Sequence, residues 1–354
     1  MTSDTAVERR AVRVLVVDDS VVVRRVLSRA LDAEAGLELA GVAANGQIAL
    51  DRLDRARPDV VILDLDMPEM NGFETLAAIR RTHPALPVIV FSHLTSAGAT
   101  ATLDALALGA TGFALKPRAD GIGLAEDQVR NQLFPLLRAV TDRAASALPP
   151  APFVPGPNTG QQRVTAIVVA VSTGGPRALA LIVPTLPADL AVPIFVVQHM
   201  PPLFTKTLAD RLDRIAAVDV VEATAGEVVV PGRVYVAPGG HHLTLERMAT
   251  TVTVAITDAP SENSCRPAAD VLFRAAAAVY GTGVLAVVLT GMGSDGLRGS
   301  ETVCAAGGSV IAQSAETAVV ASMPEAVCAA GLVDRVVPLD AIGPELVRRT
   351  SGHD

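Results

Sequence analysis

Short apolar runs alternate with segments in which apolar positions recur every three or four residues through the first part of the chain. The runs lie at 12–17, 37–43, 60–63, 88–91 and 112–115. Helical patterns lie between them at 20–33, 46–55, 73–80 and 100–108. Runs of this length between helical segments are typical of a parallel sheet with helices on its faces. Residues 12–138 are therefore predicted to form a doubly wound α/β domain.

A second alternating pattern fills residues 163–349. Its expected strands are 164–171, 192–198, 218–222, 234–237, 251–257, 284–290 and 309–312. Its expected helices are 176–182, 204–215, 268–278 and 297–306. This pattern predicts a larger, Rossmann-like α/β domain with a mostly parallel sheet. As an alternative for one part of it, 239–247 and the strand that starts at Thr251 form an antiparallel hairpin.

The segment 139–162 separates the two patterns and lacks both periodicities. Prolines at 149, 150, 152, 155 and 157 are too dense for a helix or a strand interior. We expect a semi-rigid, extended, proline-rich linker between the two domains. The length of 354 residues agrees with two domains.

Composition narrows the choice of partners and location. The net charge is -8, aromatic residues make up 3% and Trp is absent, which argues against a nucleic-acid surface. The first eleven residues are polar and no apolar signal core follows. The longest charge-free stretch, 275–294, is interrupted by glycines, so no membrane insertion is expected. Three widely spaced cysteines predict buried free thiols and a cytoplasmic location: Cys265, Cys304 and Cys328.

Acidic residues follow two expected strands of the first domain. Asp18 and Asp19 come after the first strand, and Asp64 follows the third. Strand ends of a parallel sheet meet at one edge, so three carboxylates would lie together and attract Mg²⁺. Ser92 and Lys116 also end apolar runs, where a hydroxyl and an ammonium can contact a phosphoryl group.

A hydroxyl, an imidazole and a carboxylate occupy the corresponding positions of the second domain. Ser172 follows 164–171 in Ser-Thr-Gly-Gly-Pro, His199 follows 192–198, and Asp295 lies in Gly-Met-Gly-Ser-Asp-Gly. Together they predict a serine hydrolase triad. The backbone N–H of Met292 is the candidate oxyanion donor. A glycine-rich phosphate-binding loop and an ordinary turn remain open for the Ser172 segment, and His241 and His242 are competing bases or weak metal ligands.

Two known families share these motifs. Val16-Val-Asp-Asp-Ser20, Leu63-Asp-Leu-Asp-Met-Pro-Glu-Met-Asn-Gly72, Ser92 and Lys116-Pro117 resemble the two-component receiver domain, which has a flavodoxin-like fold. That resemblance implies phosphorylation of Asp64, with Asp66 as the rival acceptor. It also implies Mg²⁺ at Asp18, Asp19 and Asp64, and switch or phosphate-contact roles for Ser92, Lys116 and Phe113. Phe113 cannot donate the hydroxyl bond that a tyrosine gives.

The second domain is similar to the catalytic domain of chemotaxis protein-glutamate methylesterases. The resemblance rests on Ser172-Thr-Gly-Gly-Pro176, Gln198-His-Met200, Cys265-Arg-Pro267 with Asp270, and Thr290-Gly-Met-Gly-Ser-Asp-Gly296. It implies hydrolysis of glutamate γ-methyl esters on the cytoplasmic part of methyl-accepting chemotaxis receptors, and deamidation of particular glutamines. It also implies a chemotaxis-type histidine kinase as phosphodonor and no cofactor for hydrolysis. Thr173 is expected to position His199 or the substrate.

Regulation by the first domain is a further expectation. We expect the unphosphorylated receiver to cover the Ser172 crevice and phosphorylation of Asp64 to weaken that contact. Two other functions stay open from the sequence. One is a response regulator whose output domain binds a partner without catalysis, and the other is an esterase or amidase that acts on a substrate other than a receptor.

Overall fold

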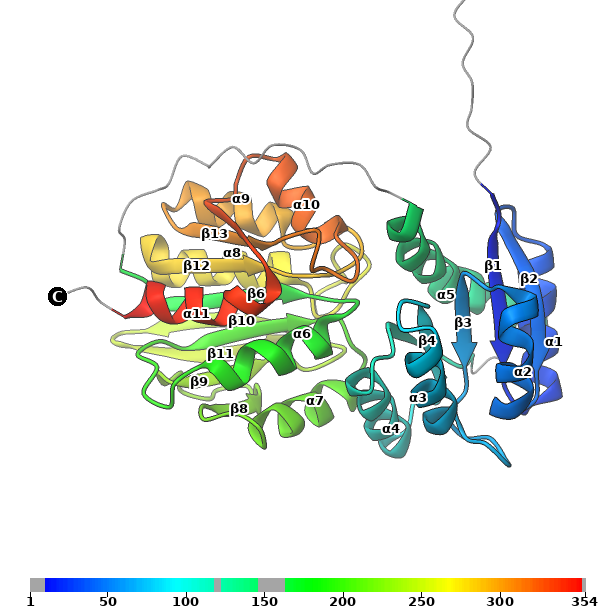
Figure 1. Ribbon diagram of the computed structural model, residues 1–354. Coiled ribbons are helices and arrows are strands. Elements are labelled where there is room, and N and C mark those ends of the chain that lie inside the picture. The colour runs from blue at the N-terminus through cyan, green and yellow to red at the C-terminus, as the bar shows by residue number, and fades with distance from the viewer. Residues whose placement is uncertain (1–9, 118–121, 146–162, 352–354) are drawn as a thin grey trace, which may run out of the picture. The chain divides into compact units, whose positions relative to one another are not determined.

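The computed structural model describes residues 10–117, 122–145 and 163–351. The chain divides into two compact units, residues 1–147 and 148–354, and each unit is described by itself. Each unit is built on a parallel sheet with helices packed against it (Figure 1). The prediction of two α/β domains is confirmed.

The first unit contains a five-stranded sheet in the order β2-β1-β3-β4-β5. All four pairings in it are parallel. The strands are β1 (Val12–Val17), β2 (Leu37–Ala43), β3 (Val60–Leu63), β4 (Val88–Ser92) and β5 (Gly112–Leu115). β3 and β4 are buried along their whole length, which explains their unbroken apolar sequences.

Five helices connect or follow these strands. They are α1 (Val21–Asp32), α2 (Gly46–Ala56), α3 (Gly72–Thr82), α4 (Ser96–Ala107) and α5 (Ile122–Ala145). Polar residues begin the first three: the side chains of Ser20, Asn45 and Asn71 each accept a hydrogen bond from a backbone N–H of the first turn. These caps fix where each loop ends, and the loops carry the polar residues of the strand ends.

Helix α5 is longer than the predicted domain boundary at 138 allows. It continues through 139–145, the first part of the segment expected to be a linker. Val140 is buried there, so the apolar stripe that includes Leu137 extends past the expected end of the helix. The rest of the predicted linker, 146–162, lies outside the described residues.

The second unit contains a seven-stranded sheet in the order β14-β13-β12-β6-β7-β9-β8, and its pairings are all parallel. Its strands are β6 (Ala166–Val171), β7 (Ile194–Gln198), β8 (Asp219–Glu222), β9 (Arg233–Val236), β12 (Val284–Val288), β13 (Ser309–Gln313) and β14 (Arg335–Val337). Side chains of β6 alternate between two helical layers. Val168 belongs to the core that contains Phe273 of α8, whereas Val169 lies with Leu179 of α6 and Leu346 of α11.

The α-helices of this unit are α6 (Gly175–Ile182), α7 (Phe204–Asp213), α8 (Ala269–Tyr280), α9 (Leu297–Ala305), α10 (Ser322–Ala329) and α11 (Leu339–Thr350). The hairpin alternative is confirmed, because β10 (His242–Met248) pairs with β11 (Thr251–Thr257) in a separate antiparallel sheet. Leu243, Leu245 and Val254 of this hairpin join the main core.

Two further expectations can be compared with the fold. The three cysteines are free, but they are half-buried rather than buried. Cys304 and Cys328 lie at the margin of the core, where part of each side chain still meets solvent. Within the described ranges, no helix has the length and apolar character needed to cross a membrane.

Candidate functional site

The sheet of the first unit gathers its acidic residues at one edge. Strand β1 lies between β2 and β3, so the order of the strands reverses beside it, and ligand crevices form at such points. Asp18 and Asp19 follow β1, and Asp64 follows β3. One carboxylate oxygen from each lies within 4.8 Å of those of the other two.

A lysine lies among these carboxylates. Lys116 Nζ is 2.8 Å from Asp18 Oδ2 and 2.7 Å from Asp64 Oδ2, and all three side chains are almost fully buried. Burial raises the pKa of Asp64 above its ordinary value, although the hydrogen bond from Lys116 opposes that effect. For Lys116, burial acts to lower the pKa, but the two carboxylates outweigh it and the pKa is raised. The lysine therefore remains charged and offsets part of the negative charge.

The acidic pocket fits a magnesium ion by its donor chemistry. All three candidate ligands are carboxylate oxygens, which hard divalent cations prefer. Asp18 and Asp64 are buried while Asp19 is exposed, so the cluster opens to solvent on one side. Mg²⁺ usually keeps several waters, and this open side suits that requirement. The cluster is typical of the Mg²⁺ site of a receiver domain.

The other predicted residues of this pocket occupy different positions. Ser92 ends β4 and is buried, and its hydroxyl donates to the carbonyl of Gly98 in α4 at 3.3 Å. Phe113 lies on β5 and is half-buried. Asp66, the rival acceptor, is exposed. Asp64 is the buried aspartate of the two and the one that contacts Lys116.

The second sheet has its own reversal of strand order. The chain runs from β6 to β7 on one side and places β12 against the other side of β6. Ser172 follows β6, His199 follows β7 and Asp295 lies in the loop after β12. The structure thus brings the three predicted residues to the carboxyl edge of adjacent strands.

The turn after Ser172 depends on two glycines. Gly174 has a φ of 84°, which glycine adopts without strain, and it precedes the first residue of α6. A Cβ at Gly175 would lie 1.9 Å from the Gln198 side-chain oxygen. Pro176 lies in the first turn of the helix, where its fixed φ is favourable. This sharp turn leaves Ser172 half-buried at the start of α6.

Backbone contacts hold the segments of Ser172 and His199 together. The His199 N–H donates to the carbonyl of Val171 at 3.1 Å. The side-chain amide of Gln198 donates to the carbonyl of Ser172 at 3.0 Å. Among the described residues, no hydrogen bond joins the Ser172 hydroxyl to the imidazole. Such contacts often form only when substrate is bound.

The imidazole and the carboxylate are bonded directly. His199 Nε2 lies 2.6 Å from Asp295 Oδ2, and their side chains are 11% and 2% exposed. Burial acts to lower the pKa of His199, but Asp295 and the neighbouring Cys265 side chain raise it to about 9. Burial acts to raise the pKa of Asp295, yet His199 and two backbone N–H groups bring it below its ordinary value. The pair is therefore a charge-assisted hydrogen bond.

The loop after β12 passes against Ser172. A Cβ at Gly291 would lie 2.8 Å from the Cβ of Ser172. The N–H of Gly291 donates to Val320 and the N–H of Gly293 donates to the Ser322 hydroxyl. Within the described part of the chain, the N–H of Met292 between them has no hydrogen-bond partner. The carbonyl of Thr173 accepts a bond from the Thr290 hydroxyl at 2.8 Å, which ties the Ser172 turn to β12.

The two competing histidines do not take part in the Ser172 cluster. His242 is fully buried, and its ring nitrogens contact the carbonyl of Pro260 and the N–H of Ala268. His241 pairs with Asp258 on the surface. Because both ring nitrogens of His242 are occupied, it is not available as a base for Ser172.

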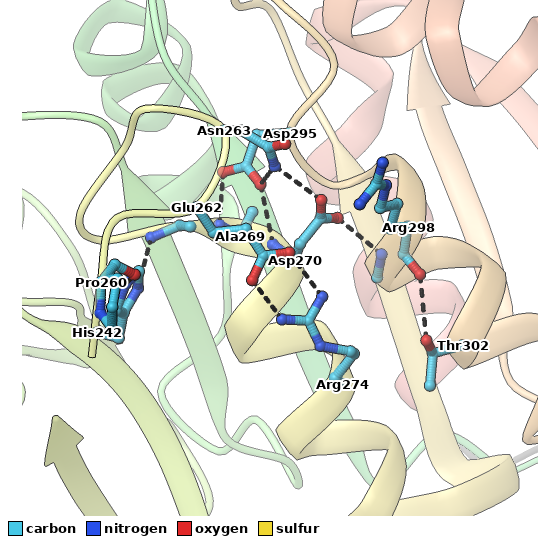
Figure 2. Close-up of polar contacts among 12 residues, drawn as sticks. His242, Pro260, Glu262, Asn263, Ala269, Asp270, Arg274, Asp295, Arg298 and Thr302 are labelled. Atoms are coloured by element: carbon cyan, nitrogen blue, oxygen red, sulfur yellow. Dashed lines mark hydrogen bonds and ion pairs between the residues drawn. The ribbon is translucent and has the colours of Figure 1, made fainter.

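Three contacts of this site were not predicted from the sequence. Gln198 and Thr290 bond to the backbone of the Ser172 turn, and Asn263 donates to Asp295 Oδ1 at 2.8 Å (Figure 2). The glutamine and threonine sit at strand ends next to predicted residues, which is a weak signal. No local pattern indicates the partner of Asn263, because it is 32 residues away from Asp295.

Comparisons with known proteins agree over nearly the whole chain. A family model for the CheB methylesterase matches residues 167–346, and one for the response regulator receiver domain matches residues 14–122. A protein-glutamate methylesterase/protein-glutamine glutaminase of Nocardioides sp. is 48% identical over 349 residues, which are 96% of this chain and 95% of that protein. A relative from Caulobacter vibrioides, named protein-glutamate methylesterase/protein-glutamine glutaminase 2, is 44% identical over 95% of this chain and 98% of its own length.

A solved structure supports the assignment of the second unit. The CheB methylesterase catalytic domain of Thermotoga maritima is 44% identical, covers 53% of this chain and 99% of that domain, and has a TM-score of 0.52. The fold and these matches define a response regulator in which a methylesterase domain follows a receiver domain. The chain belongs to the CheB family of protein-glutamate methylesterases/protein-glutamine glutaminases.

Proposed function

We propose that the chain hydrolyses glutamate γ-methyl esters on the cytoplasmic region of methyl-accepting chemotaxis receptors, and deamidates particular receptor glutamines. The observation that carries this proposal is the 2.6 Å bond between His199 and Asp295 at the edge of the sheet where the half-buried Ser172 lies. Membership of the family supports the substrate class. An enzyme with these substrates acts in the cytoplasm.

The geometry supports a specific division of roles. Asp295 holds Nε2 of His199, and we assign acceptance of the Ser172 proton to Nδ1, in competition with the neighbouring Cys265 side chain. The Ser172 oxygen then forms a bond to the γ-carbonyl carbon, and the carbonyl oxygen gains negative charge. The N–H of Met292 stabilises that charge. Thr173 contributes by holding the turn through its carbonyl bond to Thr290.

The tetrahedral intermediate collapses when the bond from carbon to the leaving group breaks. His199 returns its proton to that group, so methanol leaves from an ester and ammonia from an amide. Water then attacks the acyl-serine with His199 again as base, which restores Ser172 and releases glutamate. Ester and glutamine thus share one site and one set of residues.

Phosphorylation is proposed to occur on Asp64, with a chemotaxis-type histidine kinase as phosphodonor. Asp64 is buried beside Lys116, whereas the rival Asp66 is exposed. Asp18, Asp19 and Asp64 would hold Mg²⁺, which supplies neutralising charge when bound. Lys116 contacts the phosphoryl oxygens, Ser92 gives up its bond to Gly98 for the phosphoryl group, and Phe113 reports the change on β5.

Ser172→Ala tests the hydrolytic proposal. We expect methanol release from methylated receptor to fall by at least about 10⁴-fold, because the nucleophile is lost. Ser294→Ala is the matched control, since Ser294 is an exposed serine of the loop that carries Asp295. Ser172→Ala protein that still releases methanol at the wild-type rate contradicts the proposal.

Control by the receiver is tested with a phosphodonor and a truncation. We propose that the unphosphorylated receiver covers the Ser172 crevice, so removal of residues 1–160 raises basal methanol release. A small phosphodonor should raise the rate of the full chain and leave the truncated chain unchanged. Equal basal rates for both proteins would contradict inhibition by the receiver.

A further inference from the structure

Two helices next to the triad begin without a capping side chain of their own. α8 follows Ala268 and α9 follows Gly296, and neither residue makes a side-chain hydrogen bond to its helix. A helix start leaves backbone N–H groups without intrahelical partners, and a carboxylate is the favoured ligand for them. Ala269 and Asp270 at the start of α8, and Gly296 and Gly299 at the start of α9, are buried, so their N–H groups need partners within the protein.

Each helix obtains its cap from the segment of the other. Asp295, just before α9, accepts the N–H of Ala269 at 2.6 Å and that of Asp270 at 3.1 Å. Asp270, in the first turn of α8, accepts the N–H of Gly296 at 3.0 Å and that of Gly299 at 2.7 Å. Each carboxylate therefore caps the helix that begins beside the other one. As a result, the position of Asp295 depends on that of Asp270.

One amide joins the two carboxylates. Asn263 Nδ2 lies 2.8 Å from Asp295 Oδ1 and 2.8 Å from Asp270 Oδ2, and Figure 2 shows it between them. An amide nitrogen has two N–H groups, so one side chain serves both acceptors. Asp295 and Asp270 are 2% and 1% exposed. Two buried like charges repel, and a donor shared between them reduces that cost.

The turn that contains Asn263 is held in place by a residue of α8. Glu262 and Cys265 exchange backbone hydrogen bonds, and the two residues between them have φ values of 53° and 61°. This combination is typical of a type I′ turn. Arg274 of α8 makes two bonds to the Glu262 carboxylate, at 2.8 and 2.5 Å. The ion pair fastens the turn to the helix that Asp295 caps.

We propose that Asn263 and Asp270 are positioning residues, which fix the triad carboxylate of Asp295 for its bond to His199. Asp270 sets the start of α9 and so the loop of Asp295, and Asn263 locks both carboxylates in one arrangement. This inference rests on the proposed hydrolytic function. The claim that Asn263 and Asp270 fix the bond between His199 and Asp295 can be tested without any measurement of hydrolysis.

A purely local role for Asn263 is the competing explanation. Asparagine tolerates positive φ and is favoured in type I′ turns, so on this explanation the residue serves only the backbone conformation. Asn263→Gly separates the two explanations, because glycine suits the turn but has no amide side chain. Ser264→Gly is the matched control, since Ser264 is the other left-handed residue of the same turn.

The experiment uses the full chain and three measurements. These are the rate of methanol release at saturating methylated receptor, the pH dependence of that rate, and the downfield proton resonance of the His199–Asp295 bond. For Asn263→Gly we expect a rate about 10- to 100-fold below wild type, the size expected when buried acceptors lose a partner. Asp270→Asn should also lower the rate, because an amide NH₂ in place of the acceptor oxygen would face the NH₂ group of Asn263, and two donors cannot bond to each other. Ser264→Gly should match the wild type.

The pH profile and the resonance distinguish positioning from a loss of folding. Without the amide, Asp295 is held less firmly against His199, so the pKa of His199 should fall and the rise in rate of Asn263→Gly should lie at lower pH than in wild type. The imidazole resonance should shift or broaden in Asn263→Gly and stay unchanged in Ser264→Gly. A wild-type rate, profile and resonance in Asn263→Gly overturn the inference. The resonance decides the question even if the wild type fails to hydrolyse the receptor, in which case only the proposed function is lost.

Discussion

The two units neutralise buried carboxylates in different ways. In the first, a side-chain cation lies between them: Lys116 contacts both Asp18 and Asp64. In the second, Asp270 and Asp295 receive backbone N–H groups of two helix starts and the amide of Asn263, and Asp295 also bonds to His199. A lysine on a flexible chain can give way to a metal ion or a phosphoryl group. Backbone N–H groups are fixed, so the second arrangement suits a preorganised catalytic group.

Removal of divalent cations should abolish the activity of the first site and leave that of the second unchanged. With a chelator present, we expect no phosphorylation of Asp64 from a small phosphodonor, because the acidic pocket then lacks the cation that phosphoryl transfer requires. Basal methanol release should not change, since the proposed triad consists of protein side chains. Phosphoprotein gel shift and methanol assay on the same samples measure both. A chelator that abolishes basal hydrolysis would show that the comparison is wrong.

Asp295→Asn should cause a large loss of hydrolysis and leave the first unit unaffected. The asparagine cannot carry the charge that stabilises the protonated imidazole, so we expect kcat to fall about 10⁴-fold. Phosphorylation of Asp64 should be unchanged. Steady-state methanol release and phosphoprotein analysis of the same variant provide the measurement and its control. A small loss of kcat would mean that His199 is held and activated without this carboxylate.

Lys116→Met should be costly for the first unit. It leaves Asp18 and Asp64 buried without their cation, and loss of one partner of a buried ion pair costs about 3 to 5 kcal/mol of unfolding free energy. Mg²⁺ should restore part of the loss, because it binds only the folded pocket. Lys206→Met is the control, since its pair with Asp210 is exposed and contributes about 0 to 1 kcal/mol. Urea unfolding with and without Mg²⁺ gives these values.

Strand ends explain why the sequence predicted so much of both sites. An apolar run that stops at a polar residue marks the edge of a parallel sheet, and Asp64, Ser172 and His199 all follow such runs. The signal weakens in short or exposed elements. β14 has three residues and only one of them is buried, so it was not predicted.

The partners of these residues were much less predictable. Asn263 gives no periodic signal, and its role depends on two carboxylates whose positions exist only once α8 and α9 pack together. His241 and His242 stand side by side in the sequence, yet one is exposed and the other fully buried. Local pattern identifies the residue type at a strand end. It does not show which distant side chain completes the hydrogen bonds.

The pH dependence of hydrolysis gives the smallest expected effect. His199 must lose its proton to act as base, and its pKa of about 9 is above the ordinary value. We expect kcat/KM to rise about 10-fold per pH unit well below that pKa and to level off above it, so about 50-fold from pH 7 to pH 9. The same shift stabilises the folded protein fully below the ordinary pKa near 6.5, and this contribution is lost as pH rises through about 9.

Cys265→Ala sharpens this prediction. The Cys265 side chain helps to raise the pKa of His199, so its removal should move the rise in kcat/KM to lower pH while Asp295 still holds the imidazole. Cys304→Ala is the control, because this free cysteine lies on α9 near the carbonyl of Leu332. A profile that is flat between pH 7 and pH 9 would mean that the imidazole is already neutral there. The main role of Asp295 and its N–H donors would then be to hold the imidazole in position, and not to raise the pKa of His199.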